Sequence, residues 1–425
     1  MATLPASDTR PRIVTLDIVR GIAVMGILAM NIVAFAMPPQ AYLNPLAYGT
    51  ETVFDFAVYA FNAVLVDGKM RGLFSFLLGA SMLLVAQLAQ ARDESPAAVT
   101  FRRQLWLLLF GMLHYYLIWY GDILIGYALL GMVAWLFRDK RPRTLVIWGI
   151  LFLAVQLLIM AAIAGYAQSL AAAVSGANPS PDDLKAWEEM GRDVAAPSAA
   201  ALKENLALYL GPWSGIVDYQ VTEKATMPLF FTFLFGCETL AFMLLGMAGL
   251  KSGYLTGDWD RRSYVRTALI CLAISVPAYV VIVAMLFAEN FAVQSIYTWS
   301  FAATVPFRPL MVVAYAALII LATRGGGWLT ERIAAAGRAA FTNYLGTSIL
   351  MTGLFYGWGL GLYGSLGRAE LYLVVFAMWA LMLLWSKPWL DRFAYGPFEW
   401  LWRSLARWDV QPMRKRVTPG AAAPA

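Results

Sequence analysis

The stretch FGMLHYYLIWYGDILIGYALLG, residues 110–131, decides how this chain of 425 residues is expected to fold. It is almost wholly apolar, yet it holds the one histidine of the sequence, His114, and an aspartate eight positions later, Asp122. Gly121 lets the chain turn between the two apolar halves, and Asp122 is a residue type that favours the start of a helix. We therefore predict two adjoining membrane helices that meet at this turn.

The whole chain shares this apolar character. Hydrophobic residues make up 60% of it and charged residues 14%, and the mean hydropathy is +0.64, whereas soluble domains carry about 25% charged residues. Several apolar runs reach the roughly 20 residues that a helix needs to cross a hydrocarbon core of about 30 Å. We predict an all-α fold, a polytopic membrane helix bundle of about ten transmembrane helices. The predicted spans are 13–37, 70–90, 104–120, 121–137, 145–168, 227–250, 265–288, 309–323, 338–360 and 369–386.

Neither the cysteines nor the net charge points to a metal or to a nucleic acid. Cys237 and Cys271 both lie in apolar runs without the spacing of metal ligands, and a single histidine adds too little for a zinc site. The net charge of +6 is carried by Lys and Arg residues between the apolar runs, where membrane topology explains it. We predict no metal site, no bound cofactor and no nucleic-acid partner, and we expect membrane lipids around the chain.

The apolar segment 51–66 is short for a span, and the charges of the loops decide its placement. If it does not cross, both termini lie in the cytoplasm together with the basic segments RDKRPR (138–143), KSGYLTGDWDRR (251–262) and RKRV (414–417). This arrangement agrees with the rule that Lys and Arg accumulate on the cytoplasmic side. If the segment crossed, every later loop would change sides. We therefore predict a re-entrant or interfacial helix on the outer side.

A long polar loop divides the chain into two halves. We expect a five-helix N-terminal membrane half at 1–168, a periplasmic loop at 169–225 and a five-helix C-terminal membrane half at 226–410. Within the loop, SPDDLKAWEEM begins with Ser180, a good N-cap, followed by a proline and two aspartates, and so predicts a short helix. The last residues, 411–425, are expected to form a disordered cytoplasmic tail.

Ionisable side chains inside the predicted spans cost several kcal/mol, so each is a candidate functional residue. Asp17 and Arg20 are three residues apart and can pair on one face of the first span, with Asn31 three turns further along. This pair either fixes the bundle or presents Arg20 to the anionic part of a ligand. Glu238, near the middle of 227–250, is either a neutral hydrogen-bonded side chain or part of a proton relay.

The remaining candidates lie toward the outer ends of the predicted spans. Asp122 either caps its helix or holds the imidazole of His114 in one tautomer, which would make His114 a stronger base. Without that role, His114 is a hydrogen-bonded buried residue. Trp119 lies at the depth of an interfacial aromatic belt. Lys69 and Arg71 either flank their helix or stabilise negative charge near the histidine.

Five segments of the chain carry a recognisable pattern. They are VTLDIVRGIAVMGILAMNIVAF (14–35), AYLNPLAYG (41–49), the stretch 110–131, GRAAFTNYLGTSILMTGLFYGWGLGLYG (337–364) and FAYGPFEWLWRSL (393–405). Together they resemble the YeiB-like family of bacterial inner-membrane proteins, whose C-terminal region is described as a domain of unknown function. The residues that match this family's pattern are His114, Trp119, Gly121, Asp122 and, in the second span, Lys69. The resemblance implies a multi-pass protein of the bacterial inner membrane.

The first span is also similar to a second group of proteins. Its LDxxRG pattern, formed by Asp17, Arg20 and Gly21, and the later Asn31 resemble those of the heparan-α-glucosaminide N-acetyltransferase-like enzymes. These belong to a wider set of membrane acyltransferases, which move acyl groups from cytoplasmic donors to acceptors across the membrane. This resemblance therefore implies acyl transfer.

These observations leave three hypotheses of function. In the first, the chain is a membrane acyltransferase in which His114 is the base or a transient acyl carrier and Asp122 orients it. Acyl-CoA is then the co-substrate, and the acceptor is a small molecule, a lipid or a glycan on the periplasmic side. In the second, the chain is a transporter or lipid-handling protein whose buried charges form a substrate and proton path. The third is a structural role as an accessory subunit. The candidate substrate-binding residues are Asp17, Arg20, Asn31, Lys69, Arg71, Trp119 and Glu238.

Overall fold

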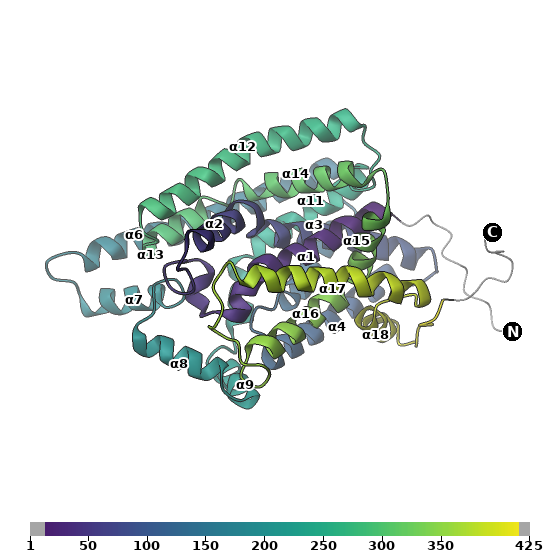
Figure 1. Ribbon diagram of the computed structural model, residues 1–425. Coiled ribbons are helices and arrows are strands. Elements are labelled where there is room, and N and C mark those ends of the chain that lie inside the picture. Colours follow the sequence, from purple (N-terminus) through teal and green to yellow (C-terminus); the bar gives the residue numbers. More distant parts are fainter. Residues whose placement is uncertain (1–12, 416–425) are drawn as a thin grey trace.

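The computed structural model describes residues 13–415, and in this part of the chain every regular element is helical. Among these residues, β-type pairing consists of one isolated bridge between Phe393 and Arg414. The predicted all-α class is therefore confirmed. Most of the long helices lie side by side along one common direction (Figure 1).

Each predicted span corresponds to a helix or to a pair of helices. In the first half these are α1 (Val14–Ala36), α3 (Lys69–Gln90), α4 (Pro96–Leu117), α5 (Leu124–Ala134) with its continuation η3 (Trp135–Phe137), and α6 (Pro142–Val174). In the second half they are α10 (Met227–Leu234) with α11 (Gly236–Lys251), α12 (Arg261–Ala288), α14 (Arg308–Thr323), α16 (Ala340–Phe355) and α17 (Leu371–Arg392).

Length and apolar composition allow a smaller number of these helices to cross a membrane on their own. Within the described residues five stretches qualify, namely α1, Val53–Gln90, α6, α12 and α17. A sixth is obtained if α10 and α11, which meet at an angle of 60°, are counted as one broken span. The stretch formed by α5 and η3, and α14, are apolar but shorter. The fold is thus compatible with a multi-pass membrane protein.

The helices differ sharply in how much of their apolar surface the fold covers. In α1, 72% of the most apolar stretch is buried, and Figure 1 shows this helix in the middle of the bundle. In α6 and α12, which lie at the periphery, the buried share is only 17% and 33%. Side chains such as Leu158, 70% exposed, and Leu269, 63% exposed, therefore face outward. Soluble monomers rarely leave large contiguous apolar surfaces exposed, whereas lipid covers them.

One helix that packs closely on α1 was not predicted from the sequence. This is α15 (Trp328–Arg338), which is short and of mixed polarity, so no apolar run reveals it. Glycines permit the close approach of the two helices. A Cβ atom at Gly337 would lie 1.8 Å from the backbone oxygen of Asp17, and one at Gly21 would lie 2.1 Å from that of Ile333. The glycine of the LDxxRG pattern therefore has a packing role.

The segment 51–66 contains a short helix and a wide turn. After η1 (Pro39–Tyr42), the helix α2 (Val53–Phe61) continues into the π-helical turn η2 (Asn62–Val66). Gly68 then adopts a left-handed conformation, with φ of +70°, and α3 begins at the next residue. Val53 and Phe54 at the start of α2 are 82% and 75% exposed. The predicted helix is therefore present as a shorter element joined directly to α3.

The polar loop between the two halves is helical, as predicted. It contains α7 (Pro181–Gly191), α8 (Ala199–Tyr209) and α9 (Trp213–Thr222). The Ser180 side chain accepts a hydrogen bond from the backbone N–H of Asp183, so the predicted N-cap of α7 is confirmed. In Figure 1 these helices lie at the end of the bundle opposite to the start of α1 and to α18 (Pro397–Arg407).

Two further segments are the connection between α12 and α14 and the C-terminal tail. The short α13 (Val293–Ser295) and the π-helical turn η4 (Ile296–Ala302) connect α12 to α14. Of the predicted tail at 411–425, residues 411–415 lie beside the end of α17. There the backbone N–H of Ala394 donates a hydrogen bond of 2.9 Å to the carbonyl oxygen of Met413. The rest of this tail lies outside the described residues, as do residues 1–12.

Candidate functional site

His114 and Asp122 form a buried pair across the turn between α4 and α5. The Nδ1 atom of His114 lies 2.7 Å from Oδ2 of Asp122, and the exposed fractions of the two side chains are 1% and 0%. The other carboxylate oxygen, Oδ1, accepts a hydrogen bond of 2.9 Å from the backbone N–H of Ile125. The Asp122 side chain thus contacts both the first turn of α5 and the imidazole.

The pairing determines which nitrogen of His114 is available for chemistry. An ionised Asp122 accepts a hydrogen bond and cannot donate one, so the proton of a neutral imidazole lies on Nδ1. The Nε2 atom then carries a lone pair. This atom is buried and has no hydrogen-bond partner among residues 13–415. A buried nitrogen that has no partner, beside an orienting carboxylate, is the arrangement expected of a general base.

Aromatic rings surround the imidazole. The ring centroid of Tyr344 lies 5.2 Å from that of the imidazole. The ring centroid of Trp119 lies 6.2 Å from it, in an edge-on orientation. Trp119 is itself held by stacking on Phe35, with ring centroids 3.8 Å apart. Its indole Nε1–H is buried and without a partner in the described part of the chain. The site therefore contains a second polar atom that is ready to bind a ligand.

Two small cavities adjoin this group of side chains, and Trp119 lines both. The first also contacts Asn31, Tyr344 and Ser348. The second lies between the end of α4, the helix α9 and the end of α16, and it is bordered by Gln220. Each has about 10 Å³ of space for a water-sized sphere, which is room for roughly one water molecule.

Unpaired polar atoms gather around the second cavity. Besides the indole N–H of Trp119, Oε1 of Gln220 and the hydroxyl of Tyr356 are buried and lack partners among the described residues. Gln220 is 3% exposed and Tyr356 1% exposed. Because buried polar groups nearly always find a hydrogen-bond partner, these three atoms indicate an ordered water or the polar group of a ligand at this place. Trp213 and Trp358 form aromatic walls of the same cavity.

Glu238 lies at a bend that the sequence did not predict. The predicted continuous span 227–250 is bent between α10 and α11, so Glu238 lies in the first turn of α11, where the helix dipole favours negative charge. Its Oε2 lies 2.7 Å from Nη2 of Arg71, and its Oε1 pairs with Nη1 of Arg308. Its backbone N–H donates to Oε1 of Gln156 at 3.1 Å. We call Glu238, Arg71 and Arg308 the ion cluster.

Lys69 lies in the same region as the ion cluster. Its side chain is fully buried, its Nζ donates to the carbonyl of Ala63 at 2.6 Å, and the ammonium group stands 3.3 Å above the ring centroid of Tyr279. Within residues 13–415, no hydrogen bond or ion pair joins Lys69 or Arg71 to His114. The polar contacts of these two cations are thus with Ala63, Thr239 and Glu238.

The polar residues of α1 are arranged as predicted. Nη1 of Arg20 lies 3.3 Å from Oδ1 of Asp17, and Nη2 of Arg20 donates to the hydroxyl of Ser81 at 2.8 Å. Asn31 lies about 21 Å further along the helix axis from Asp17, at 1.5 Å per residue. There it borders the cavity beside Trp119. This helix thus extends from the Asp17–Arg20 pair to the surroundings of His114.

Sequence reasoning missed several residues of these groups. Arg308 immediately precedes an apolar run, so it resembled a flanking residue, yet it is 7% exposed and pairs with Glu238. Tyr344 and Gln220 carry no charge, and although Tyr344 lies in the family segment 337–364, the sequence marks neither side chain as part of a site. Only the three-dimensional fold places them beside Trp119. A systematic search for polar residues within or next to apolar runs would have found Arg308.

Fold and site together define a helical protein of membrane type, with a buried histidine–aspartate pair and two small cavities nearby. Residues 250–409 match the family described as "Protein of unknown function (DUF418)". The chain is 32% identical to "Uncharacterized protein YxaH" of Bacillus subtilis (strain 168), over 98% of this chain and 100% of that protein. It is 33% identical to "Uncharacterized protein YeiB" of Escherichia coli (strain K12), over 93% of this chain and 96% of that protein.

The extent of these matches establishes the family. The chain belongs to the YeiB-like family, as the sequence motifs had indicated. No solved structure matches the chain. The names of the relatives assign no activity, so an account of function has to come from the geometry of the site.

Proposed function

We propose that this protein is an integral-membrane acyltransferase. It would move an acyl group from a cytoplasmic donor of the acyl-CoA type to an acceptor that faces the periplasm. The observation that carries this proposal is the buried contact of 2.7 Å between His114 and Asp122, together with the unpaired Nε2 atom on the opposite side of the imidazole. A histidine with a carboxylate on one nitrogen and a free lone pair on the other is suited to accept a proton.

In the proposed transfer, His114 acts first as a base and then as an acid. Nε2 of His114 accepts the proton of an acceptor hydroxyl or amine as the acceptor atom attacks the thioester carbonyl. The carbon–sulfur bond then breaks, and the proton passes from the imidazolium to the departing thiolate. Asp122 holds the imidazole in one orientation and stabilises its positive charge during the transfer. In a covalent variant, Nε2 would itself carry the acyl group for a short time.

Charge that develops on the carbonyl oxygen requires a hydrogen-bond donor near the histidine. Lys69 and Arg71 already have partners elsewhere, whereas the indole N–H of Trp119 is buried, unpaired and adjacent to His114. We assign this stabilising role to Trp119. A preorganised donor in a site shielded from water stabilises such charge more effectively than a solvated one.

The proposal includes a topology of about ten crossings in the bacterial inner membrane, with both termini in the cytoplasm. It is supported by contacts among the basic loops, since Nζ of Lys251 donates to the carbonyls of Arg138 and Lys140 at 2.5 and 2.7 Å. The start of α1 and α18 lie at one end of the bundle, and α7, α8 and α9 lie at the other (Figure 1). On this topology α2 is interfacial and α7 to α9 are periplasmic.

The donor would enter from the cytoplasmic end. Arg20, whose side chain is 24% exposed, would contact its anionic part, and Asp17 would orient Arg20. Asn31 lies further along the same helix and borders a cavity beside Trp119. The acceptor, a small molecule, a lipid or a glycan, would bind from the opposite end, where the unpaired atoms of Gln220 and Tyr356 surround the second cavity.

A transfer assay tests this function directly. Purified protein is incubated with radiolabelled acetyl-CoA and a bacterial lipid and glycan extract, and label in the acceptor fraction is counted. We expect transfer by the wild type and at least about a 100-fold loss in His114→Ala, because general bases contribute roughly 10²–10⁴ to rate. Tyr166→Phe, on the exposed side of α6, is the matched control and should retain full activity. Undiminished transfer by His114→Ala would refute the mechanism.

One observation favours a second candidate function, that of a transporter. Charged residues buried next to a broken helix are typical of substrate and ion sites in secondary transporters, and Glu238 lies directly after the bend between α10 and α11. This candidate predicts proton-coupled uptake of a solute into vesicles that contain the protein. Uptake abolished by Glu238→Gln but retained by His114→Ala would favour it over the acyltransferase.

A further inference from the structure

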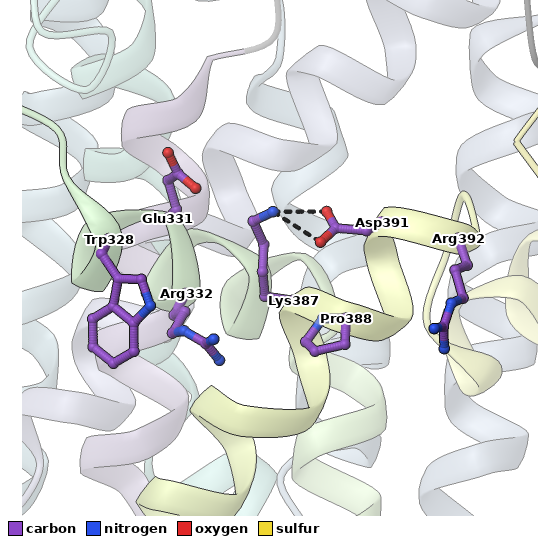
Figure 2. A pocket seen from close by; sticks show the side chains of 7 residues that line it. All are labelled: Trp328, Glu331, Arg332, Lys387, Pro388, Asp391 and Arg392. Atoms are coloured by element: carbon purple, nitrogen blue, oxygen red, sulfur yellow. Dashed lines mark hydrogen bonds and ion pairs between the residues drawn. The ribbon is translucent and has the colours of Figure 1, made fainter. Parts of the chain in front are cut away.

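A groove at the end of the bundle between α15 and α17 is distinct from the site around His114. Its volume is about 320 Å³, within the range of roughly 300–1,000 Å³ that is usual for small-molecule sites. Trp328, Glu331 and Arg332 line one wall, and Lys387, Asp391 and Arg392 line the other (Figure 2). Pro388 contributes to the floor. The groove thus has charged walls contributed by two helices.

The charges along the groove are incompletely paired. Lys387 and Asp391 neutralise each other, since Nζ lies 2.8 and 2.9 Å from the two carboxylate oxygens. Besides this pair, the lining contains two arginines, Arg332 and Arg392, and one further carboxylate, that of Glu331. Three cationic and two anionic side chains therefore leave one net positive charge. No ion pair joins Arg332 or Arg392 to a carboxylate within the described part of the chain.

Arg332 is held in place with part of its hydrogen-bonding capacity unused. Its Nη1 donates to the carbonyl of Leu383 at 3.0 Å, and its guanidinium stacks 4.6 Å from the ring centroid of Trp328. Its Nε is buried and has no partner among residues 13–415. A guanidinium that is fixed on one side and unsatisfied on the other is well suited to bind the oxygens of a phosphate group.

The position of the groove agrees with this chemistry. It lies toward the end of the bundle that contains the start of α1 and α18 (Figure 1). Trp328 is 68% exposed at its edge, and the side chain of Lys387 is 33% exposed. Tryptophan and lysine side chains are the typical residues of the region where lipid headgroups meet water. A ligand there can present its charge to the groove from the membrane surface or from solution.

We propose that the groove between α15 and α17 binds a phosphate monoester or diester, with Arg332 as its principal contact and Arg392 adding positive charge on the side of α17. The Lys387–Asp391 pair borders the same site, and Glu331 limits the number of negative charges that it accepts. Such a phosphate can belong to an anionic phospholipid or to a soluble ester. The inference does not depend on acyl transfer at His114.

Native mass spectrometry of the full-length protein in detergent tests this proposal. Two probes are added separately, phosphatidylglycerol and glycerol 1-phosphate, and the bound fraction is measured as the probe concentration is raised. The double variant Arg332→Gln/Arg392→Gln should bind about tenfold more weakly than the wild type, since it loses charge-assisted contacts. The matched control Arg262→Gln/Arg266→Gln, which removes two exposed arginines at the start of α12, should bind like the wild type.

A variant of opposite charge makes the result independent of any damage to the fold. Glu331→Gln/Asp391→Asn removes both carboxylates and frees Lys387, so it should bind the probe more tightly than the wild type, which a misfolded protein would not do. Binding of phosphatidylglycerol alone would identify a lipid headgroup site, and equal binding of both probes a site for soluble phosphate esters. Equal binding by the wild type and by the variant that lacks Arg332 and Arg392 would overturn the proposal, as would weaker binding by the variant without carboxylates.

Discussion

The two groups of buried charge in this protein differ in how fully their ionisable side chains are paired, although Nε of Arg308 in the ion cluster is also buried without a partner among the described residues. In the ion cluster, both oxygens of Glu238 pair with arginines, and Arg71 and Arg308 also donate to Thr239 and Thr304. At the histidine site, the outward nitrogen of His114 has no partner, and two small cavities lie close by.

The difference separates structural charge from reactive charge. A cluster whose carboxylate is paired through both oxygens holds helices α3, α11 and α14 together. An orienting contact on one side of an imidazole, with an unpartnered nitrogen on the other, leaves a nitrogen that can accept a proton. We therefore expect variants of the two groups to fail in different ways, the first in stability and the second in chemistry.

The largest effect is expected for Glu238→Ala. Removal of this carboxylate leaves the buried Arg308 and the partly buried Arg71 without their counter-charge, and breaking a buried ion pair in this way costs about 3–5 kcal/mol. His114→Ala should cost less, roughly 1–3 kcal/mol, because Asp122 keeps its hydrogen bond from Ile125. Thermal unfolding of both variants in the same detergent measures the contrast. Greater loss of stability in His114→Ala would mean that the roles assigned to the two groups are reversed.

A smaller effect is expected for Trp119→Phe. This change keeps an aromatic ring to stack on Phe35 but removes the indole N–H, so transfer activity should fall by about tenfold to 100-fold with little change in thermal stability. The acyl-transfer assay described above, combined with a thermal unfolding curve, gives both values. Activity equal to that of the wild type would exclude the indole N–H as the donor to the carbonyl oxygen.

The fold class could be predicted from the sequence because membrane helices need long apolar runs, which composition reveals directly. The pair formed by His114 and Asp122 was also within reach, since the two residues are eight positions apart across one turn. The bend before Glu238 was not, because the run around Phe235 and Gly236 is apolar on both sides and contains no proline there.

Contacts between distant segments could not be predicted from the sequence either. Glu238 and Arg308 are 70 positions apart, and each alone resembles an isolated charge in or beside an apolar run. The helix α15 escaped notice for another reason, since its mixed polarity resembles that of a loop. Which helices are neighbours is decided by packing, and a single sequence does not show it.

The most direct test uses the fact that His114 is the only histidine in the chain. Protein labelled with ¹⁵N-histidine and purified without a histidine tag gives imidazole signals from this residue alone, so nitrogen NMR at neutral pH observes its tautomer directly. We expect a protonated Nδ1 and an unprotonated Nε2, because Asp122 accepts the hydrogen bond from Nδ1. A proton found on Nε2 would contradict the assignment of His114 as the base.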